Sequence, residues 1–334
     1  MATFLHRGAM TPGPRAIAPG VLGMTLVGSS VAVSATLTTA PLLTAQAIRY
    51  AVAALVLVAL ARSLHIPITA PRGREWLWLG GIAATGLVLF NIAVVRGVAQ
   101  GQPATIAVAI ACAPVALGVI GPLLQHQAPQ RKIVLAAVAV TAGSVLVEGA
   151  GHVHLIGIAW AVVTLATESA FTLLAVPVLG RHGAWGVSVH SVWLGAAMFT
   201  VLALLGEGPA AVSRLSTADL GAIAYLAVVT VVAFVLWYSA VAVLGPARSG
   251  LIAGVAPVAA ALTGIILGSR APSLAMWGGI AVVLGGLAAG LRVPARSTPA
   301  ATADPLDPAA PALAGQALVE PGPAQRPPVP VARS

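Results

Sequence analysis

The sequence predicts an all-α integral membrane protein of ten transmembrane helices, arranged as two inverted repeats of five helices each. Three observations lead to this prediction: the composition, a series of ten apolar stretches, and a match of the chain with itself at a fixed offset. Hydrophobic residues make up 59% of the chain and charged residues only 7%, against about 25% charged residues in ordinary globular domains. So little charge cannot keep the surface of a 334-residue protein in water, so the surroundings are predicted to be a lipid bilayer.

The helices are placed by length, because a transmembrane helix needs about 20 mostly apolar residues. The first stretch follows two arginines, as a signal peptide would, but it is about 20 residues long and similar stretches follow it, so we expect it to be retained as the first helix. The spans predicted for the first half are 17–37, 42–61, 76–98, 104–125 and 131–148. Those predicted for the second half are 156–178, 184–205, 219–243, 247–268 and 274–291.

The chain matches itself when it is shifted by 143 residues. The letters "APVA" occur at 113–116 and again at 256–259, and three of the four prolines between residues 103 and 147 fall on prolines. Each predicted half holds an odd number of spans, so the second half enters the membrane from the opposite side. Inverted repeats are typical of carriers, with a substrate site near the bilayer midplane where the halves meet. The matched prolines are Pro103 with Pro246, Pro114 with Pro257, and Pro129 with Pro272.

Orientation follows from the distribution of basic residues, which gather on the cytoplasmic side of membrane proteins. With a cytoplasmic N-terminus, the outside loops hold only Arg214 and Arg270, and Arg96 lies near an outer helix end. The sequence therefore predicts a multi-pass protein of the plasma or inner membrane with both termini in the cytoplasm. The basic residues of the inside segments are Arg7, Arg15, Arg62, Arg72, Arg74, Arg131, Lys132, Arg181, Arg248, Arg292 and Arg296.

The domain organisation has four parts. The last part is rich in Pro and Ala and has no apolar periodicity, so we expect a disordered cytoplasmic tail. The predicted parts are a cytoplasmic N-terminal segment (1–15), a first five-helix repeat (16–150), a second five-helix repeat (155–293) and the tail (294–334).

Several motifs resemble those of one known family. Gly28-Ser29-Ser30 lies in the first predicted helix, although Val27 stands where that family tends to have Trp, and "AIRYAVAALVLV" occupies 47–58. The proline-bearing fourth and ninth helices and the Gly-rich fifth and tenth helices match in the same way. Over roughly 16–292 the chain therefore resembles the drug/metabolite transporter superfamily, and within it the EamA-like family, and both five-helix repeats are expected to be EamA-like. The resemblance implies transport of small organic metabolites such as amino acids or drug-like compounds. It also implies a central cavity between the halves, with helices five and ten at the periphery.

Pro114 and Pro257 are candidate gating residues. Each lies a third to a half of the way along its predicted helix, where a proline removes a backbone hydrogen bond and kinks the helix. Kinks at equivalent places in two inverted halves are suited to gating, while the alternative is that they only shape the packing.

Glu168 and Arg49 are the charged candidates for substrate binding or coupling, because a charge at the centre of a bilayer costs a few kcal/mol. Glu168 lies near the middle of the sixth predicted span, where a carboxylate could carry a proton or pair with a substrate ammonium. Its structural alternatives are an interhelical hydrogen bond or an ion pair with Arg49. Arg49 lies about eight residues into the second span and could pair with Glu168, cap free carbonyls or hold a substrate carboxylate.

Four uncharged or weakly basic side chains complete the candidate site. His190, six residues into the seventh span, could titrate near neutral pH or be held by a neighbour. Asn91, Trp237 and Tyr238 could line the cavity or serve in helix packing.

Other classes of function find no support in the sequence. It contains no HExxH, GxSxG, P-loop or GxGxxG motif, so neither an enzyme nor a nucleotide-driven pump is predicted, and no cofactor or catalytic residue is assigned. The formal charge of +9 comes from cations at the ends of apolar segments, which argues against nucleic acid as a partner. Glu148, His152 and His154 have the residue types of a metal site but no fourth partner nearby, so no metal is assigned.

The expected protein is thus a carrier, an exporter of small organic solutes that works by alternating access and is driven by an ion or solute gradient. Its expected partners are a small-molecule substrate and the lipid bilayer, with a homodimer left open. A membrane-embedded enzyme and a regulatory or scaffold subunit are the alternatives.

Overall fold

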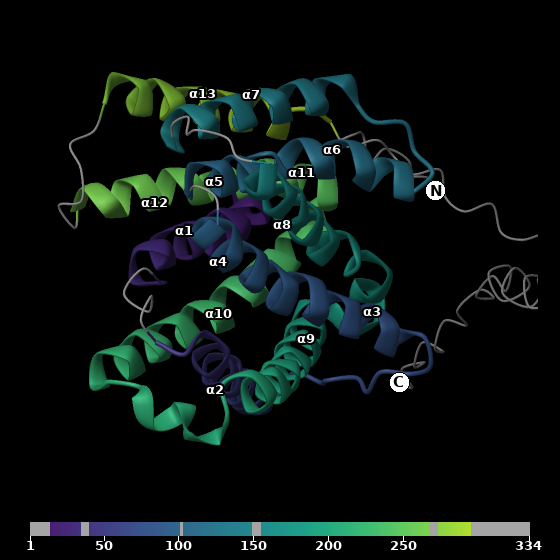
Figure 1. The fold of residues 1–334 in the computed structure, drawn as a ribbon. Helices are drawn as coiled ribbons and strands as arrows, with labels where there is room; N and C mark the ends of the chain where they lie inside the picture. The colour runs from purple at the N-terminus through teal and green to yellow at the C-terminus, as the bar shows by residue number, and fades with distance from the viewer. Residues whose placement is uncertain (1–13, 35–39, 101–102, 149–154, 267–272, 295–334) are drawn as a thin grey trace, which may run out of the picture. The chain divides into compact units, whose positions relative to one another are not determined.

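The computed structural model describes residues 14–34, 40–100, 103–148, 155–266 and 273–294, which form helices and turns and include no strand. The expected tail and most of the N-terminal segment lie outside these residues. In the first half the elements are α1 (Pro14–Ser34), α2 (Leu42–Ser63), α3 (Glu75–Ile82), the π-helix η2 (Ala83–Leu89), α4 (Phe90–Gln100), α5 (Pro103–Ala111), α6 (Ala113–Leu124) and α7 (Arg131–Glu148) (Figure 1). In the second half they are α8 (Leu155–Leu173), α9 (Val176–Gly206), the 3-10 helix η3 (Pro209–Arg214), α10 (Thr217–Leu244), α11 (Pro246–Ala253), α12 (Val255–Ile266) and α13 (Leu274–Leu291).

Eight helical segments among the described residues are long and apolar enough to cross a membrane. They correspond to eight of the ten predicted spans. Helices α1, with 21 residues, and α7, with 18 residues, occupy the two remaining predicted positions. An all-helical membrane protein is therefore confirmed.

Two adjoining predicted boundaries are wrong. The span predicted to end at residue 178 ends at Leu173, and α9 begins at Val176 rather than at 184. Pro177 stands in the first turn of α9, where proline is well tolerated, and it starts a new helix there. Gly183 then breaks α9 internally with φ 63° and ψ 177°, a conformation that glycine adopts most easily.

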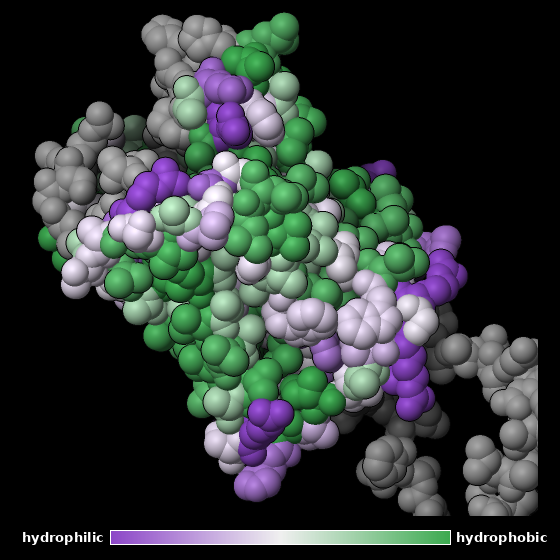
Figure 2. Space-filling view, turned by 60° about the horizontal axis from the view of Figure 1, so that its bottom comes forward, coloured by the Kyte–Doolittle hydropathy of each residue, from purple (hydrophilic) through white to green (hydrophobic). Residues whose placement is uncertain are grey.

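The surface of the helical bundle is apolar, as a lipid-facing surface must be. Large hydrophobic side chains stand exposed on many helices, among them Leu55, Leu77, Leu155, Leu205 and Leu274. Figure 2 shows one such face, largely hydrophobic, with hydrophilic side chains gathered in patches near its margins. An exposed apolar surface of this extent is what a membrane span presents to lipid.

Helices of the first half pair with helices of the second half. Helices α2 and α9 lie side by side, as do α7 and α13 (Figure 1), and α1 packs on α10 while α8 packs on α4. The α7–α13 contact depends on glycine, because a Cβ at Gly143 would lie 2.7 Å from the Gly279 carbonyl oxygen. A Cβ at Gly28 would lie 2.2 Å from the Ala256 carbonyl oxygen, so this glycine permits the close approach of α1 to α12.

The predicted helix interruptions at the two central prolines are present. Cys112 separates α5 from α6, and Gly254 separates α11 from α12. Each break lies two or three residues before Pro114 or Pro257, whose missing N–H leaves a carbonyl of the preceding turn unbonded. The fourth helical segment of each half is thus divided at nearly the same place.

Candidate functional site

The Arg49 cluster is a polar group inside the bundle, built from α2, α4 and α10. Arg49 is partly buried; its Nε donates to Thr230 Oγ1 at 3.0 Å and its Nη1 donates to Gln46 Oε1 at 3.3 Å. Its guanidinium carbon also lies 5.0 Å from the centroid of the Tyr50 ring, within cation–π range. Because Thr230 comes from the second half and Gln46 from the first, this cation lies where the two halves meet.

Asn91 closes the same cluster by a directed series of hydrogen bonds. Gln46 uses its carbonyl oxygen for Arg49, so its Nε2 donates to Asn91 Oδ1 at 3.1 Å. Asn91 Nδ2 in turn donates to Tyr50 Oη at 3.1 Å and to the Leu87 carbonyl at 2.6 Å. Asn91 follows the π-helix η2, and single π-helical turns often accompany functional sites.

Arg49 and Glu168 do not pair. None of the acidic side chains in the described part of the chain lies within ion-pair distance of Arg49, whose two hydrogen-bond partners are neutral. The predicted alternative of an Arg49–Glu168 ion pair is therefore wrong for this conformation. The reason is that the two side chains are held by different elements, Arg49 by its contacts to α2 and α10 and Glu168 on α8.

Glu168 is a partly buried carboxylate without a hydrogen bond or ion pair among the described residues. The buried hydroxyls beside it do not serve it, because Thr164 donates to the Trp160 carbonyl and Thr167 to the Val163 carbonyl of the same helix. One turn further along α8, Phe171 packs on Tyr238 of α10. The carboxylate oxygens of Glu168 are therefore free to bind a proton or a substrate group, as a coupling or substrate-binding residue requires.

Trp237 and Tyr238 of α10 lie in an apolar core that they form with side chains of α3 and α9. Both are buried, and neither Trp237 Nε1 nor Tyr238 Oη has a hydrogen-bond partner among the described residues. Tyr238 packs on Phe171 and Phe234, with ring centroids 5.3 and 6.1 Å away. A buried donor without a partner costs free energy, so these two groups are available to a polar ligand.

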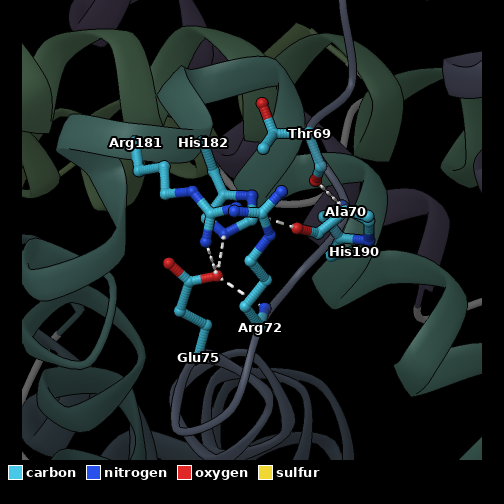
Figure 3. Close-up of polar contacts among 7 residues, drawn as sticks. All are labelled: Thr69, Ala70, Arg72, Glu75, Arg181, His182 and His190. Atoms are coloured by element: carbon cyan, nitrogen blue, oxygen red, sulfur yellow. Dashed lines mark hydrogen bonds and ion pairs between the residues drawn. The ribbon is translucent and has the colours of Figure 1, made fainter.

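His190 lies near the middle of α9, and both of its ring nitrogens are engaged. Nδ1 accepts from Trp193 Nε1 at 3.3 Å, so Nε2 is the donor and bonds the Thr69 carbonyl at 2.9 Å. The ring is therefore a neutral imidazole held by neighbours on both sides. Figure 3 shows it beside a group of charged residues that the sequence did not single out.

That group is centred on the Glu75 carboxylate, at the start of α3. Arg181 Nη1 forms an ion pair with Glu75 Oε2, and His182 Nε2 lies 3.2 Å from the same oxygen (Figure 3). The Arg72 backbone N–H donates to this oxygen at 2.7 Å. The signal was available in the sequence, because Glu75 is one of only eight acidic residues in the chain and stands among cations at a span boundary.

Glu207, at the end of α9, is a second carboxylate that the sequence did not single out. Its oxygens accept from the Leu43 and Thr44 backbone N–H groups at 2.9 and 2.8 Å, and from Thr44 Oγ1 at 2.7 Å. It thereby caps the start of α2, where Pro41 supplies no side-chain cap. Burial acts to raise the pKa of Glu207, but the bonds from Thr44 and Leu43 and the charge of Arg214 lower it overall.

The described residues include no group of three or more His, Cys, Asp or Glu side chains placed to hold a metal ion. The residues weighed for that role, Glu148, His152 and His154, fall outside the described side chains.

Comparison with known proteins supports a transporter. Residues 16–148 match the model of the EamA-like transporter family, so the resemblance seen in the sequence is confirmed. The chain is also similar to the uncharacterized transporter YetK of Bacillus subtilis (strain 168), with 27% identity over 275 residues that cover 79% of this chain and 83% of YetK. A solved crystal structure of a protein shares the fold, with a TM-score of 0.70 and 17% identity, over 83% of this chain and 97% of that chain.

Proposed function

We propose that the chain is an exporter of small organic solutes that works by alternating access, and the match of residues 16–148 to the EamA-like transporter family supports this proposal. In this proposal ten helices cross the plasma or inner membrane as two inverted halves, with both termini in the cytoplasm. Transport draws on an ion or solute gradient. The observation that carries the proposal is the Arg49 cluster, which is built from both halves inside an apolar bundle. Its cation has no acidic partner among the described residues.

The pairing of helices supports the inverted arrangement. The second segments of the two halves pack on each other (α2 on α9), and so do the fifth segments (α7 on α13). The first segment of each half packs on the third segment of the other, α1 on α10 and α8 on α4. A two-fold relation between the halves, with its axis in the membrane plane, generates such reciprocal pairs.

We assign the substrate site to the region along α10 between Arg49 and Glu168. Thr230 and Tyr238 share one face of α10 and lie about 12 Å apart along its axis, with Phe234 between them. Arg49 at one end can bind an acidic group, since a guanidinium matches a carboxylate with paired N–H donors. Glu168 at the other end can bind an amine or carry the coupling proton. Asn91 orients the first end, and Trp237 and Tyr238 offer donors at the second.

The breaks before Pro114 and Pro257 are proposed as the joints of this movement. Each separates two short helices that can change their relative angle without loss of further backbone hydrogen bonds. Their equivalent positions in the two halves fit a mechanism in which one half closes as the other opens.

The test is transport by the purified protein in liposomes. Vesicles loaded with a soluble small-molecule extract of the expressing cells are incubated in buffer, and the solutes released are identified by mass spectrometry. We expect one chemical class to leave protein-containing vesicles unchanged in structure, and Arg49→Gln to abolish that release. Release equal to that of empty vesicles would contradict the proposed function. Chemical conversion of a solute would indicate a membrane-embedded enzyme, and release only on addition of a second protein would indicate a regulatory subunit.

A further inference from the structure

Helices α2 and α9 are joined at both ends by polar contacts, and each end has its own carboxylate. The two helices lie side by side (Figure 1) and run in opposite directions, because the start of α2 meets the end of α9 at Glu207. The segment that follows α2 meets the N-terminal part of α9 at Arg181 and His190. A helix of 22 residues is about 33 Å long, so the two ends lie on opposite sides of the bundle.

The Glu75 contact forms the first end. Glu75 and the segment before it belong to the first half, while Arg181, His182 and His190 belong to the second. Besides its ion pair with Glu75, Arg181 donates from Nη2 to the Ala70 carbonyl at 3.3 Å (Figure 3). The side chain of His182 is completely buried in this contact, and its Nδ1 has no hydrogen-bond partner in the part of the chain that the structure describes. The Glu75 carboxylate therefore makes three polar contacts here, to Arg181, His182 and the Arg72 N–H, beside two further bonds from α9 to the segment that follows α2.

The Glu207 contact forms the second end with the roles of the halves exchanged. Here the carboxylate belongs to the second half and the groups it binds belong to the first. It binds the free N–H groups at the start of α2, where the helix dipole also favours a negative charge. Each half thus supplies one carboxylate that holds the start of the second long helix of the other half.

We propose that Glu75 and Glu207 are positioning residues that hold the two ends of the transport path closed. The proposal rests on the proposed function, in which the Glu75 end faces the cytoplasm and the Glu207 end faces the exterior. Opening toward the cytoplasm separates α9 from the 64–75 segment and breaks the Glu75 contact, while the Glu207 contact stays intact. Opening toward the exterior does the reverse. In the structure both contacts are formed, so it corresponds to a state closed at both ends.

The strengths of the contacts suit this role. The side chains of Arg181 and Glu75 are 34% and 21% exposed, so water screens their ion pair and lowers the cost of separating them. Glu207 binds neutral N–H and O–H donors and remains partly exposed. Contacts of this kind can be broken by thermal motion and replaced by water, as a reversible closure requires.

The test is hydrogen–deuterium exchange of the full chain in lipid nanodiscs, which needs no substrate. With Glu75→Gln we expect amides of 64–74 and 181–190 to exchange about tenfold faster, because loss of a charge-assisted contact changes an opening equilibrium by about that factor. The amides of 42–46 should stay as protected as in the wild type. With Glu207→Gln the pattern should be reversed. Arg62→Gln removes an exposed charge near the Glu75 end without altering the contact, and should leave both regions unchanged.

A second variant guards against misfolding. Glu75→Arg combined with Arg181→Glu restores opposite charges at the two positions. It should bring the exchange rate of the 64–74 amides back to within about threefold of the wild type, because the two side chains act through their interaction with each other. The proposal is overturned if Glu75→Gln leaves 64–74 protected, if each single variant loosens both ends equally, or if the charge exchange fails to restore protection. None of these results depends on transport, so they are distinct from a failure of the vesicle experiment.

Discussion

At the scale of single residues, a charged side chain inside the membrane indicates a partner or a function. An ionised side chain inside a bilayer is costly, so each one that persists needs a partner or a task. Arg49 has neutral protein partners that leave its charge uncompensated, and Glu168 has neither a hydrogen bond nor an ion pair with a described residue. In the sequence, both residues stand out because they lie well inside predicted membrane spans. Whether their side chains contact each other depends on which way each points around its helix axis, and the sequence separation does not determine that direction.

The first prediction concerns Glu168. Replacement by Gln keeps the size and hydrogen bonding of the side chain but removes its charge and its titrating proton. We expect Glu168→Gln to insert normally, yet to lose most transport and its dependence on pH. Transport of the solute identified in vesicles, measured across a pH series, provides the check.

The double variant with Arg49→Gln serves as the control. Since the two side chains form no pair, the losses in the double variant should be at least as large as those of either single variant. Near-normal, pH-responsive transport by Glu168→Gln alone would contradict a role in coupling, and recovery of transport in the double variant would restore the ion-pair interpretation.

The second prediction concerns stability and pH at Glu207, which lies just beyond α9. Its pKa is lowered in the folded protein, so its contribution to stability is fully present above the ordinary glutamate value of about 4.3. That contribution is lost as the pH falls through the lowered pKa. We expect Glu207→Gln to lower the melting temperature at pH 7, and the difference from the wild type to vanish as the pH falls below about 4. A difference that grows on acidification would mean that the carboxylate is not held by the α2 N–H groups.

At the scale of elements, the sequence predicts well where each helix begins and ends, but it predicts poorly which helices contact one another. Eight of the ten predicted spans lie within about three residues of the helical segments at both ends, because a run of about 20 apolar residues fits few structures other than a membrane-spanning helix. The end of α8 was missed because Pro177 and Gly183 lie inside an apolar run that hides two helix boundaries. Polar contacts between elements could not be derived. Glu75 and Arg181 are 106 residues apart, and only the fold brings them together.

The third prediction concerns the two broken helices. Pro114→Ala and Pro257→Ala each restore a backbone N–H, so we expect the adjoining helices to become continuous and stiffer. Both variants should insert and fold, with melting temperatures unchanged or raised, while the rate of transport falls severalfold. Pro122→Ala is the matched control, because Pro122 lies inside α6 and has no proline at the equivalent place in the second half. Equal rates of transport in all three variants would indicate that Pro114 and Pro257 serve only in helix packing.

At the scale of the whole molecule, the account depends on two halves that cross the membrane in opposite directions. Three observations are those that such a proposed arrangement would produce: the reciprocal pairs of helices, the equivalent breaks at the prolines and the exchanged roles of Glu75 and Glu207. The self-match of the sequence predicted the repeat, and the odd number of spans in each half predicted its inversion. The segment between α2 and α3 and the segment between α9 and α10 are the equivalent connections, and in an inverted pair they must face opposite sides.

The most direct measurement labels those two connections in intact cells. Ser63 and Ser213 are exposed, and each is replaced by Cys in a Cys112→Ala background, which removes the only native cysteine. A membrane-impermeant maleimide should label Ser213→Cys in intact cells, and should label Ser63→Cys only after the cells are permeabilised. Labelling of both positions from the same side would contradict the inverted halves, and with them the proposed alternating-access mechanism.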